Sequence, residues 1–299
     1  MELGIRGLGR MGMGIARRLA RAGHRVVAFD RKAEWMAEAQ KASVIAADSL
    51  QDIPGRLPPP RAVWLMVPAG KPVEDTIAQL LPCLTSGDIV IDGGNSNYKD
   101  TVRRAQELDE RGIALLDVGT SGGIWGEKEG YCLMIGGDKQ AVDRLRPIFD
   151  SLAQPDGWLH AGPSGAGHFV KMVHNGIEYG LMQSYAEGFE LMQASDFSLD
   201  LARIAHLWNH GAVVRGWLLE LAEAALAKNP DLSGILPYVE DSGEGRWTVH
   251  ECIDRGVPAG VIALSLFNRF LSRQQDSFAA RLLAALRQQF GGHDVKTKP

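Results

Sequence analysis

The stretch Leu3-Gly-Ile-Arg-Gly7-Leu8-Gly9-Arg10-Met11-Gly12 decides the fold of the first half of this 299-residue chain. Its apolar start predicts a strand, and the helical pattern that follows the glycines stops at Gly23. In a Gly-x-Gly-x-x-Gly loop the first two glycines allow a tight turn and close approach to a pyrophosphate, and the third lets the helix pack near the strand. The positive end of the helix dipole then meets the phosphate charge. We therefore predict a dinucleotide-binding fold.

One acidic residue, Asp30, lies 18 positions after Gly12, where the predicted strand Arg25–Phe29 ends. A carboxylate in this place accepts hydrogen bonds from the ribose hydroxyls of NAD and repels the 2′-phosphate of NADP. Arg31, its neighbour, partly offsets that repulsion. We expect NAD to be the preferred cofactor and NADP to bind more weakly.

Further apolar runs alternate with helical stretches up to about residue 160. They are Val63–Val67, Ile89–Ile91, Ala114–Asp117 and Tyr131–Ile135. This alternation predicts a Rossmann-like α/β domain with a mostly parallel sheet and helices on its faces. Arg6 departs from the pattern, because a charge at the end of the first strand is costly unless it is paired. The sequence alone offers no account of it, and we expect it to lower stability.

Polar or glycine-rich loops follow three of these runs: Pro68-Ala69-Gly70, Asp92-Gly-Gly-Asn95-Ser96 and Ser121-Gly122-Gly123. Taken singly, each is an ordinary turn. Open α/β sheets, however, bind ligands at the carboxyl ends of their strands, and all three loops belong to that edge. We expect the first of them to brace the nicotinamide. The residues expected at the cofactor are Gly7, Leu8, Gly9, Arg10, Met11, Gly12, Asp30, Arg31, Val67, Pro68, Ala69 and Asn95.

From about Gly165 the pattern becomes entirely helical, which predicts a second, all-helical C-terminal domain. The expected division is residues 1–164 for the dinucleotide-binding domain and residues 165–299 for the helical one. The first helix is expected to run to about Ala194. The further helices expected are Leu199–Ala227, Thr248–Arg255, Pro258–Ser272 and Ser277–Phe290.

Within that first helix, Lys171 and Glu178 are seven residues apart, which is nearly two helical turns. The two side chains therefore share one face, about 10 Å apart along the axis, with His174 and Asn175 between them. On most helices such a pair is a solvated surface feature. Here it follows a glycine-rich turn and a nucleotide-binding motif, so we predict a base and an acid that remove a proton from one atom and deliver one to another.

The composition excludes several classes of function. A net charge of −4, with 45% hydrophobic and 23% charged residues, argues against nucleic-acid or membrane-surface binding as the main role. The three cysteines, Cys83, Cys132 and Cys252, are widely spaced and suggest reduced thiols in a cytoplasmic protein, with no metal site. Neither a signal peptide nor a membrane span is expected.

Several motifs resemble a known family. The run Gly162-x-x-Gly165-x-Gly167-x3-Lys171-x3-Asn175 resembles the β-hydroxyacid dehydrogenase superfamily. The extension His174-Asn175-Gly-Ile-Glu178-Tyr179, the loop Ile91-Asp-Gly-Gly-Asn95-Ser96 and the segment from Val118 to Cys132 are similar to the decarboxylating 6-phosphogluconate dehydrogenase family, in its short, NAD-preferring bacterial type. That resemblance implies oxidative decarboxylation of 6-phospho-D-gluconate to D-ribulose 5-phosphate in the pentose phosphate pathway.

The same resemblance implies roles for individual residues. Lys171 would be the base and Glu178 the acid, and no metal would be needed. Arg246 stands where a lysine is common in the family. The tail with Arg287 and His293 would reach the site of a neighbouring subunit, which implies a homo-oligomer built on the helical domain. The residues implied at the substrate are Asn95, Ser121, Gly122, Gly123, His174, Asn175, Tyr179, Arg246, Arg269, Arg287 and His293.

Two alternatives remain open. Another β-hydroxyacid dehydrogenase, of the 3-hydroxyisobutyrate type, would share the fold and Lys171 but would need neither Glu178 nor the arginines. A non-catalytic dinucleotide sensor would share the fold alone, because a fold does not determine an activity.

Overall fold

A computed structural model describes residues 1–297. The chain divides into two compact units, residues 1–176 and the residues from Ile177 onward. This division falls inside one helix, α8, whereas the predicted domain boundary at residues 164 and 165 lies just before that helix begins. The last two residues of the predicted second domain, 298 and 299, lie outside the described residues.

The first unit is built on an eight-stranded sheet with the order β3-β2-β1-β4-β5-β6-β7-β8. All its neighbouring strands are parallel except β6 and β7, which are antiparallel. The predicted α/β class and mostly parallel sheet are confirmed. The strands are β1 (Glu2–Arg6), β2 (Arg25–Phe29), β3 (Ile45–Ala46), β4 (Ala62–Leu65), β5 (Ile89–Asp92), β6 (Ala114–Ser121), β7 (Tyr131–Gly136) and β8 (Ala153–Gly162).

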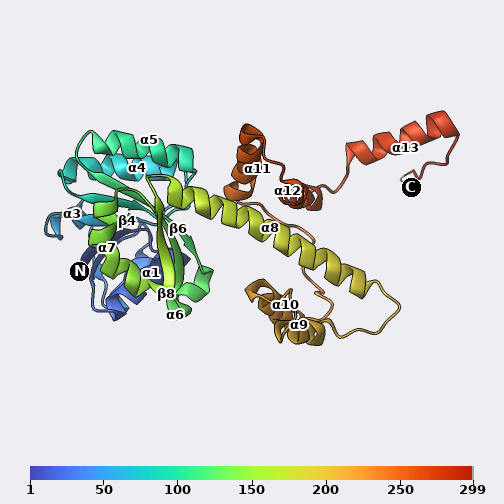
Figure 1. The fold of residues 1–299 in the computed structure, drawn as a ribbon, viewed down its shortest axis with the longest axis horizontal. Helices are drawn as coiled ribbons and strands as arrows, with labels where there is room; N and C mark the ends of the chain where they lie inside the picture. Colours follow the sequence, from blue (N-terminus) through green and yellow to red (C-terminus); the bar gives the residue numbers. More distant parts are fainter. Residues whose placement is uncertain (298–299) are drawn as a thin grey trace. The chain divides into compact units, whose positions relative to one another are not determined.

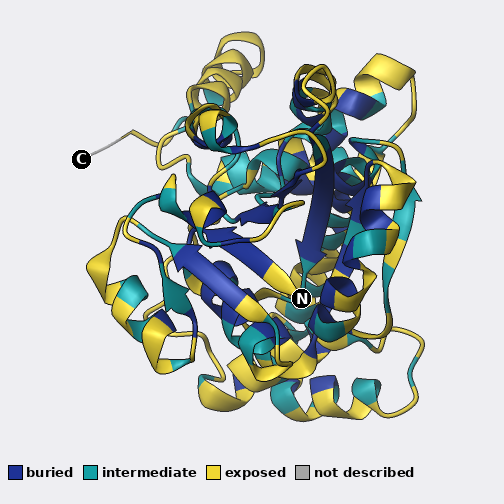
Figure 2. Ribbon diagram, turned by 90° about the vertical axis from the view of Figure 1, so that its left-hand side faces the viewer, coloured by how far each residue is buried: buried dark blue, intermediate teal, exposed yellow. Residues whose placement is uncertain are grey.

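Helices cover both faces of this sheet (Figure 1). Side chains of β2, β4, β5 and β6 alternate between two buried clusters; in β4, for example, Trp64 belongs to one cluster and Val63 and Leu65 belong to the other. Figure 2 shows the strands as the buried centre of the unit. The helices are α1 (Arg10–Arg21), α2 (Ala33–Lys41), α3 (Asp52–Gly55), α4 (Lys71–Leu80), α5 (Tyr98–Asp109), α6 (Gly126–Glu129) and α7 (Lys139–Leu152), with 3₁₀ turns at Leu81–Cys83 and Gly123–Trp125.

Two strands, β3 and β8, were not predicted. Strand β8 lies at an edge of the sheet, and most of its residues are exposed or half-buried. Its pairing with β7 shifts register between Ala153 and Trp158, around Asp156, whose φ is +57°. Because no apolar alternation marks such an irregular edge strand, the sequence pattern does not reveal it.

The cost of burying the Arg6 charge is partly offset by neighbouring residues. Its guanidinium lies 3.8 Å from Asp30 and stacks 5.3 Å from the centre of the Phe29 ring. Burial lowers the pKa of Arg6, and the charge of Asp30 opposes that effect. The structure thus supplies the partner that the sequence pattern alone does not show.

The remaining helices, on the chain after the sheet, confirm the predicted all-helical C-terminal part. Helix α8 (Ala166–Gln193) is one unbroken helix. It is followed by α9 (Leu201–Asn209), α10 (Trp217–Lys228), α11 (Gly243–Arg255), α12 (Gly260–Ser272) and α13 (Phe278–Gly291). The prediction of a single helical stretch over Leu199–Ala227 was wrong, because α9 ends at Asn209 and Gly211, with a φ of +115°, separates it from α10.

Helix α11 also begins five residues before the predicted Thr248, at Gly243. Two glycines, Gly243 and Gly245, disfavour a helix by their propensity and so hide its first turn from sequence reasoning. Packing explains Gly245, since a Cβ added there would overlap the Tyr179 ring. Tertiary contact therefore overrides local preference at this point.

Candidate active site

The glycine loop between β1 and α1 leaves room for a ligand at one position. A Cβ added at Gly7 would overlap the carbonyl oxygen of Met66, and one added at Gly12 would overlap the carbonyl oxygen of Gly7. At Gly9, by contrast, an added Cβ would meet no atom within 4 Å. Helix α1 begins directly afterwards with no side-chain cap and no acidic residue in its first turn. Open space beside uncapped N–H groups fits the pyrophosphate of a dinucleotide.

Asp30, at the end of β2, is held by the loop itself. Its carboxylate accepts hydrogen bonds from the backbone N–H of Leu8 at 2.7 Å and of Lys32 at 2.9 Å. A carboxylate has about four acceptor positions, so capacity remains for ribose hydroxyls. The residue predicted to choose the cofactor therefore also fixes the glycine loop in place.

The loops after β4 and β5 lie against each other. A Cβ added at Gly94 would overlap the carbonyl oxygen of Val67, and one added at Gly93 would overlap the indole nitrogen of Trp64. Asn95 adopts a φ of +50°, and its side-chain oxygen accepts a hydrogen bond from the N–H of Thr120, in β6, at 3.1 Å. The edge predicted to bind ligand thus brings Val67, Asn95 and the β6 strand together.

Lys171 is seated on β6 by two glycines. The start of α8 is capped by the buried Asp117 of β6, which accepts hydrogen bonds from the N–H groups of Gly165 at 2.7 Å and His168 at 2.8 Å. A Cβ added at Gly119 would overlap Cβ of Lys171, and one added at Gly167 would overlap backbone atoms of β6 and β7. The first turns of α8 therefore lie directly on the sheet.

Three of the predicted site residues meet there. Lys171 is only 5% exposed, and its Nζ lies 3.5 Å from Nδ1 of His174. That ring nitrogen lies 3.0 Å from the side-chain oxygen of Asn175. An amine and an imidazole placed in this way are groups that can take up and release protons. Glu178 follows nearly two turns after Lys171 in the same unbroken helix and is half-buried.

In the second unit, Tyr179 and Arg269 form a stacked pair. The guanidinium carbon of Arg269 lies 3.4 Å from the centre of the Tyr179 ring, and its Nη1 donates to the carbonyl oxygen of Glu240 at 2.8 Å. The Tyr179 hydroxyl accepts a hydrogen bond from the N–H of Ser242 at 2.7 Å. Two residues predicted at the substrate are therefore held by the segment that leads into α11.

Arg246 is held by a residue that sequence reasoning missed. The nearly buried carboxylate of Asp241 accepts from Nε of Arg246 at 2.5 Å and from Nη1 of Arg273 at 2.6 Å. The hydrogen bond from Arg246 is the main cause that lowers the pKa of Asp241. Both guanidinium groups also approach the Phe270 ring. Asp241 and Arg273 belong to no motif that the sequence would reveal. Their place in this cluster is seen only in the structure, where Asp241 precedes Ser242 and Arg273 approaches the Phe270 ring.

Five predicted substrate residues take no part in the contacts described above: Ser121, Gly122, Gly123, Arg287 and His293. Ser121 ends β6, and Gly122 and Gly123 follow with φ values of +121° and +53°. Arg287, in α13, and His293, just after it, are both exposed, and His293 packs edge-on against Phe290 at 6.3 Å. The predicted role of this tail in a neighbouring subunit's site stays a prediction.

Two further findings concern metal ions and membranes. Among residues 1–297, no three histidine, cysteine or acidic side chains gather in a way that could hold a metal ion. Within the same described part of the chain, none of the helices combines the length and apolarity that crossing a bilayer requires.

Comparison with known proteins gives the family. Residues 2–172 match the NAD binding domain of 6-phosphogluconate dehydrogenase, and residues 167–298 match its C-terminal domain. This chain belongs to the 6-phosphogluconate dehydrogenase family. The family comprises NAD(P)-dependent decarboxylating dehydrogenases, and the predicted family and enzyme class are confirmed.

Individual members of the 6-phosphogluconate dehydrogenase family differ in length and cofactor. An NAD(+)-dependent, decarboxylating 6-phosphogluconate dehydrogenase of Haloferax volcanii is 48% identical over 300 residues, which cover 100% of this chain and 99% of the relative. An NADP(+)-dependent one of Bacillus subtilis is 38% identical over 291 residues, 92% of this chain and 62% of the relative. The solved Plasmodium falciparum 6-phosphogluconate dehydrogenase superposes with a TM-score of 0.85 at 30% identity, covering 100% of this chain and 67% of that one.

Proposed function

We propose that this chain catalyses the oxidative decarboxylation of 6-phospho-D-gluconate to D-ribulose 5-phosphate and carbon dioxide, with NAD as its preferred cofactor. The observation that carries the proposal is the seating of Lys171: a buried lysine, beside His174 and Asn175, fixed on the sheet of a dinucleotide-binding unit by Gly119 and Gly167. The full-length similarity to an NAD(+)-dependent relative supports it.

In this mechanism Lys171 acts as a neutral amine and removes the proton from the 3-hydroxyl of the sugar acid. NAD, bound at the glycine loop, would accept the hydride from the same carbon. The resulting 3-keto acid loses its carboxyl group as carbon dioxide, while protonated Lys171 donates a hydrogen bond to the ketone oxygen and so stabilises the charge that develops there.

Glu178 would then deliver a proton to the carbon left behind in the enediol, which yields the ketone product. The pair would thus divide the work of base and acid between two side chains of one helix. His174 and Asn175, between them, would bind sugar hydroxyls.

Arg269, stacked on Tyr179, would hold the phosphate, with Arg246 beside Asp241 as a second cation. Guanidinium matches phosphate in a bidentate geometry, and stacking against a ring fixes its plane. The preference for NAD rests on Asp30, whose carboxylate at the end of β2 would repel a 2′-phosphate.

Incubation of the purified chain with 6-phosphogluconate and NAD, with NADH absorbance and trapped carbon dioxide measured together, tests the proposal. We expect the two products in a one-to-one ratio, a lower kcat/KM with NADP, and no turnover with unphosphorylated gluconate. NADH without carbon dioxide, or turnover of 3-hydroxyisobutyrate in preference, would favour the other β-hydroxyacid dehydrogenases. NAD binding with no reduction of NAD by any of these acids would favour a sensor.

A further inference from the structure

Strand β5 is held at each end by a buried aspartate paired with an arginine. At its amino end Asp88, fully buried, pairs with Nη1 of Arg61 at 3.0 Å and accepts a hydrogen bond from the N–H of the same residue at 2.6 Å. At its carboxyl end Asp92, also fully buried, pairs with Nη1 of Arg104 at 3.3 Å. Only the second pair lies at the edge of the sheet where the predicted ligand loops are.

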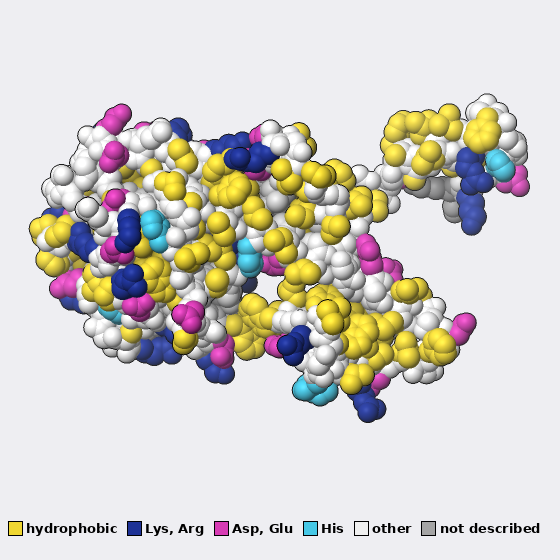
Figure 3. All heavy atoms as spheres, viewed as in Figure 1, with side chains coloured by type: hydrophobic (Ala, Val, Ile, Leu, Met, Phe, Trp, Pro, Cys, Tyr) yellow, Lys and Arg dark blue, Asp and Glu magenta, His cyan; other side chains and the backbone are white. Residues whose placement is uncertain are grey.

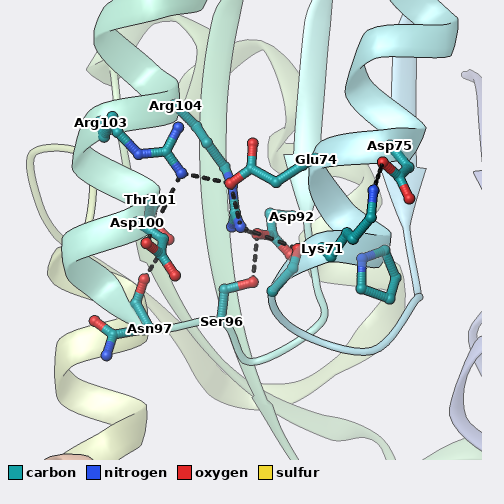
Figure 4. A network of polar contacts seen from close by, with 12 residues as sticks. Lys71, Glu74, Asp75, Asp92, Ser96, Asn97, Asp100, Thr101, Arg103 and Arg104 are labelled. Carbon is teal, nitrogen blue, oxygen red and sulfur yellow. Dashed lines mark hydrogen bonds and ion pairs between the residues drawn. The ribbon is translucent and has the colours of Figure 1, made fainter.

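Arg104, in α5, is 1% exposed and bridges several elements with one guanidinium (Figure 4). Its Nε and Nη2 contact Oε1 of Glu74, in α4, at 3.0 and 2.9 Å. Nη2 also donates to the carbonyl oxygen of Gly70 at 3.3 Å, at the turn after β4. A planar group with five donors can reach such divergent acceptors, which an ammonium group cannot do.

Asp92, which is paired with Arg104, also holds the loop that follows β5. One of its oxygens accepts from the N–H of Gly94 at 3.0 Å, and the other accepts from the buried hydroxyl of Ser96 at 2.7 Å. Asn95 stands between these two anchors with its left-handed backbone. Arg104 therefore joins the Pro68–Gly70 turn to the Asp92–Ser96 loop through direct polar contacts.

The buried charges of this junction are paired. Arg104 faces both Asp92 and Glu74, and Glu74 is shared with Arg103, an exposed residue that also pairs with Asp100 and Glu107. Burial would raise the pKa of Glu74, but hydrogen bonds from the two arginines outweigh it and lower that pKa. Removal of one buried partner leaves the others uncompensated, and the loops then lose a common restraint.

We propose that Arg104 is a positioning residue for the dinucleotide: it holds the turn after β4 and the loop after β5 in one arrangement, so that Val67, Pro68, Ala69 and Asn95 are preset to receive it. The proposal rests on the proposed function only in that these loops bind the cofactor. When the loops are already ordered, cofactor binding does not cost the free energy of ordering them, and the affinity is higher.

The test compares the two ends of β5. Arg104→Met and Arg61→Met each break a buried pair on the same strand, and Arg104→Lys keeps the charge without the planar donors. For each variant and the unaltered chain we would measure Tm and the Kd for NADH by fluorescence titration, with no sugar acid present. We expect both Met variants to lower Tm. The Kd should rise about tenfold, equivalent to about 1.4 kcal/mol, in Arg104→Met, less in Arg104→Lys, and not in Arg61→Met.

An unchanged Kd in Arg104→Met, with Tm lowered as in Arg61→Met, would show that Arg104 is structural only and would overturn the proposal. If Arg104→Met does not fold, Glu74→Gln replaces it, since Glu74 is 37% exposed. Its matched control is Arg103→Met, which removes the exposed partner of the same carboxylate. Kd should rise in Glu74→Gln and not in Arg103→Met; equal values overturn the proposal. Because NADH binding needs no turnover, a chain that binds NADH but leaves 6-phosphogluconate unchanged would refute the proposed function alone.

Discussion

The two units of the chain bury their apolar side chains to very different extents. In residues 1–176 the apolar side chains of the central strands are buried, in one cluster or the other, whereas most of the edge strand β8 is exposed or half-buried. In the second unit the buried apolar residues are few: Tyr179, Leu201, Ala205, Leu219, Leu226 and Leu266. Helix α13 buries none of its side chains. The first unit therefore has an apolar core large enough to fix the strands and loops that carry its predicted site residues.

Exposed large apolar residues, by contrast, are concentrated in the second unit. Figure 3 shows apolar side chains on the surface of its helices. They include Phe197, Leu207, Val213, Leu236, Ile253, Phe267 and Phe290. A large exposed apolar surface marks a site of association, and we propose that a second copy of the chain covers it. The proposed base and the predicted cofactor loops are positioned by a core, whereas the arginines of the second unit are positioned by local ion pairs and ring stacking.

The largest expected effects are those of substitutions at Lys171, the proposed base in the first unit, and Glu178, the proposed acid in the second. Lys171→Met should slow the oxidation itself, so that both the first turnover and the steady-state rate fall by about 10²- to 10⁴-fold. Glu178→Gln should lower steady-state turnover by a similar factor but still form one NADH per site in the first turnover, because protonation follows oxidation. Stopped-flow absorbance measures both. Near-normal turnover by Glu178→Gln would show that the acid assignment is wrong.

An intermediate effect concerns the phosphate. Arg269→Met should raise the KM for 6-phosphogluconate by about 10- to 150-fold, since a hydrogen bond to a charged group contributes about 1.5–3 kcal/mol. The Kd for NADH, measured by fluorescence, should stay unchanged. Arg255→Met, an exposed arginine of α11 that pairs with Glu251, is the control and should change neither constant. A higher Kd for NADH in Arg269→Met would contradict the division of roles between the units.

The smallest effect is expected at Asp30. Asp30→Asn keeps an acceptor for the N–H of Leu8 but removes the charge that we propose repels a 2′-phosphate. The ratio of kcat/KM for NADP to that for NAD should rise about tenfold, or about 1.4 kcal/mol. Tm should fall, because Arg6 then lacks its charged partner. An unchanged cofactor ratio would mean that Asp30 serves the glycine loop alone.

Sequence reasoning found the parts of this protein that local pattern encodes. Glycine spacing from Gly7 to Gly12 and the position of Asp30 predicted the first βαβ unit, and seven-residue spacing placed Lys171 and Glu178 in one helix, as α8 confirms. Sequence reasoning failed where tertiary packing determines the bounds of an element. The exposed edge strand β8 and the glycine-started α11 have no periodic signal, and Gly211 divides a stretch that apolar periodicity joins.

The amino-acid sequence by itself determined the α/β class, the family and the identities of the candidate base and acid, because each depends on spacing along one strand, loop or helix. Only the tertiary structure showed that Arg104 joins two loops, that Asp241 holds Arg246 and Arg273, and that Asp30 pairs with Arg6. These contacts link residues from separate elements, and a buried charge is paired by whatever the fold brings next to it. No local pattern records that choice.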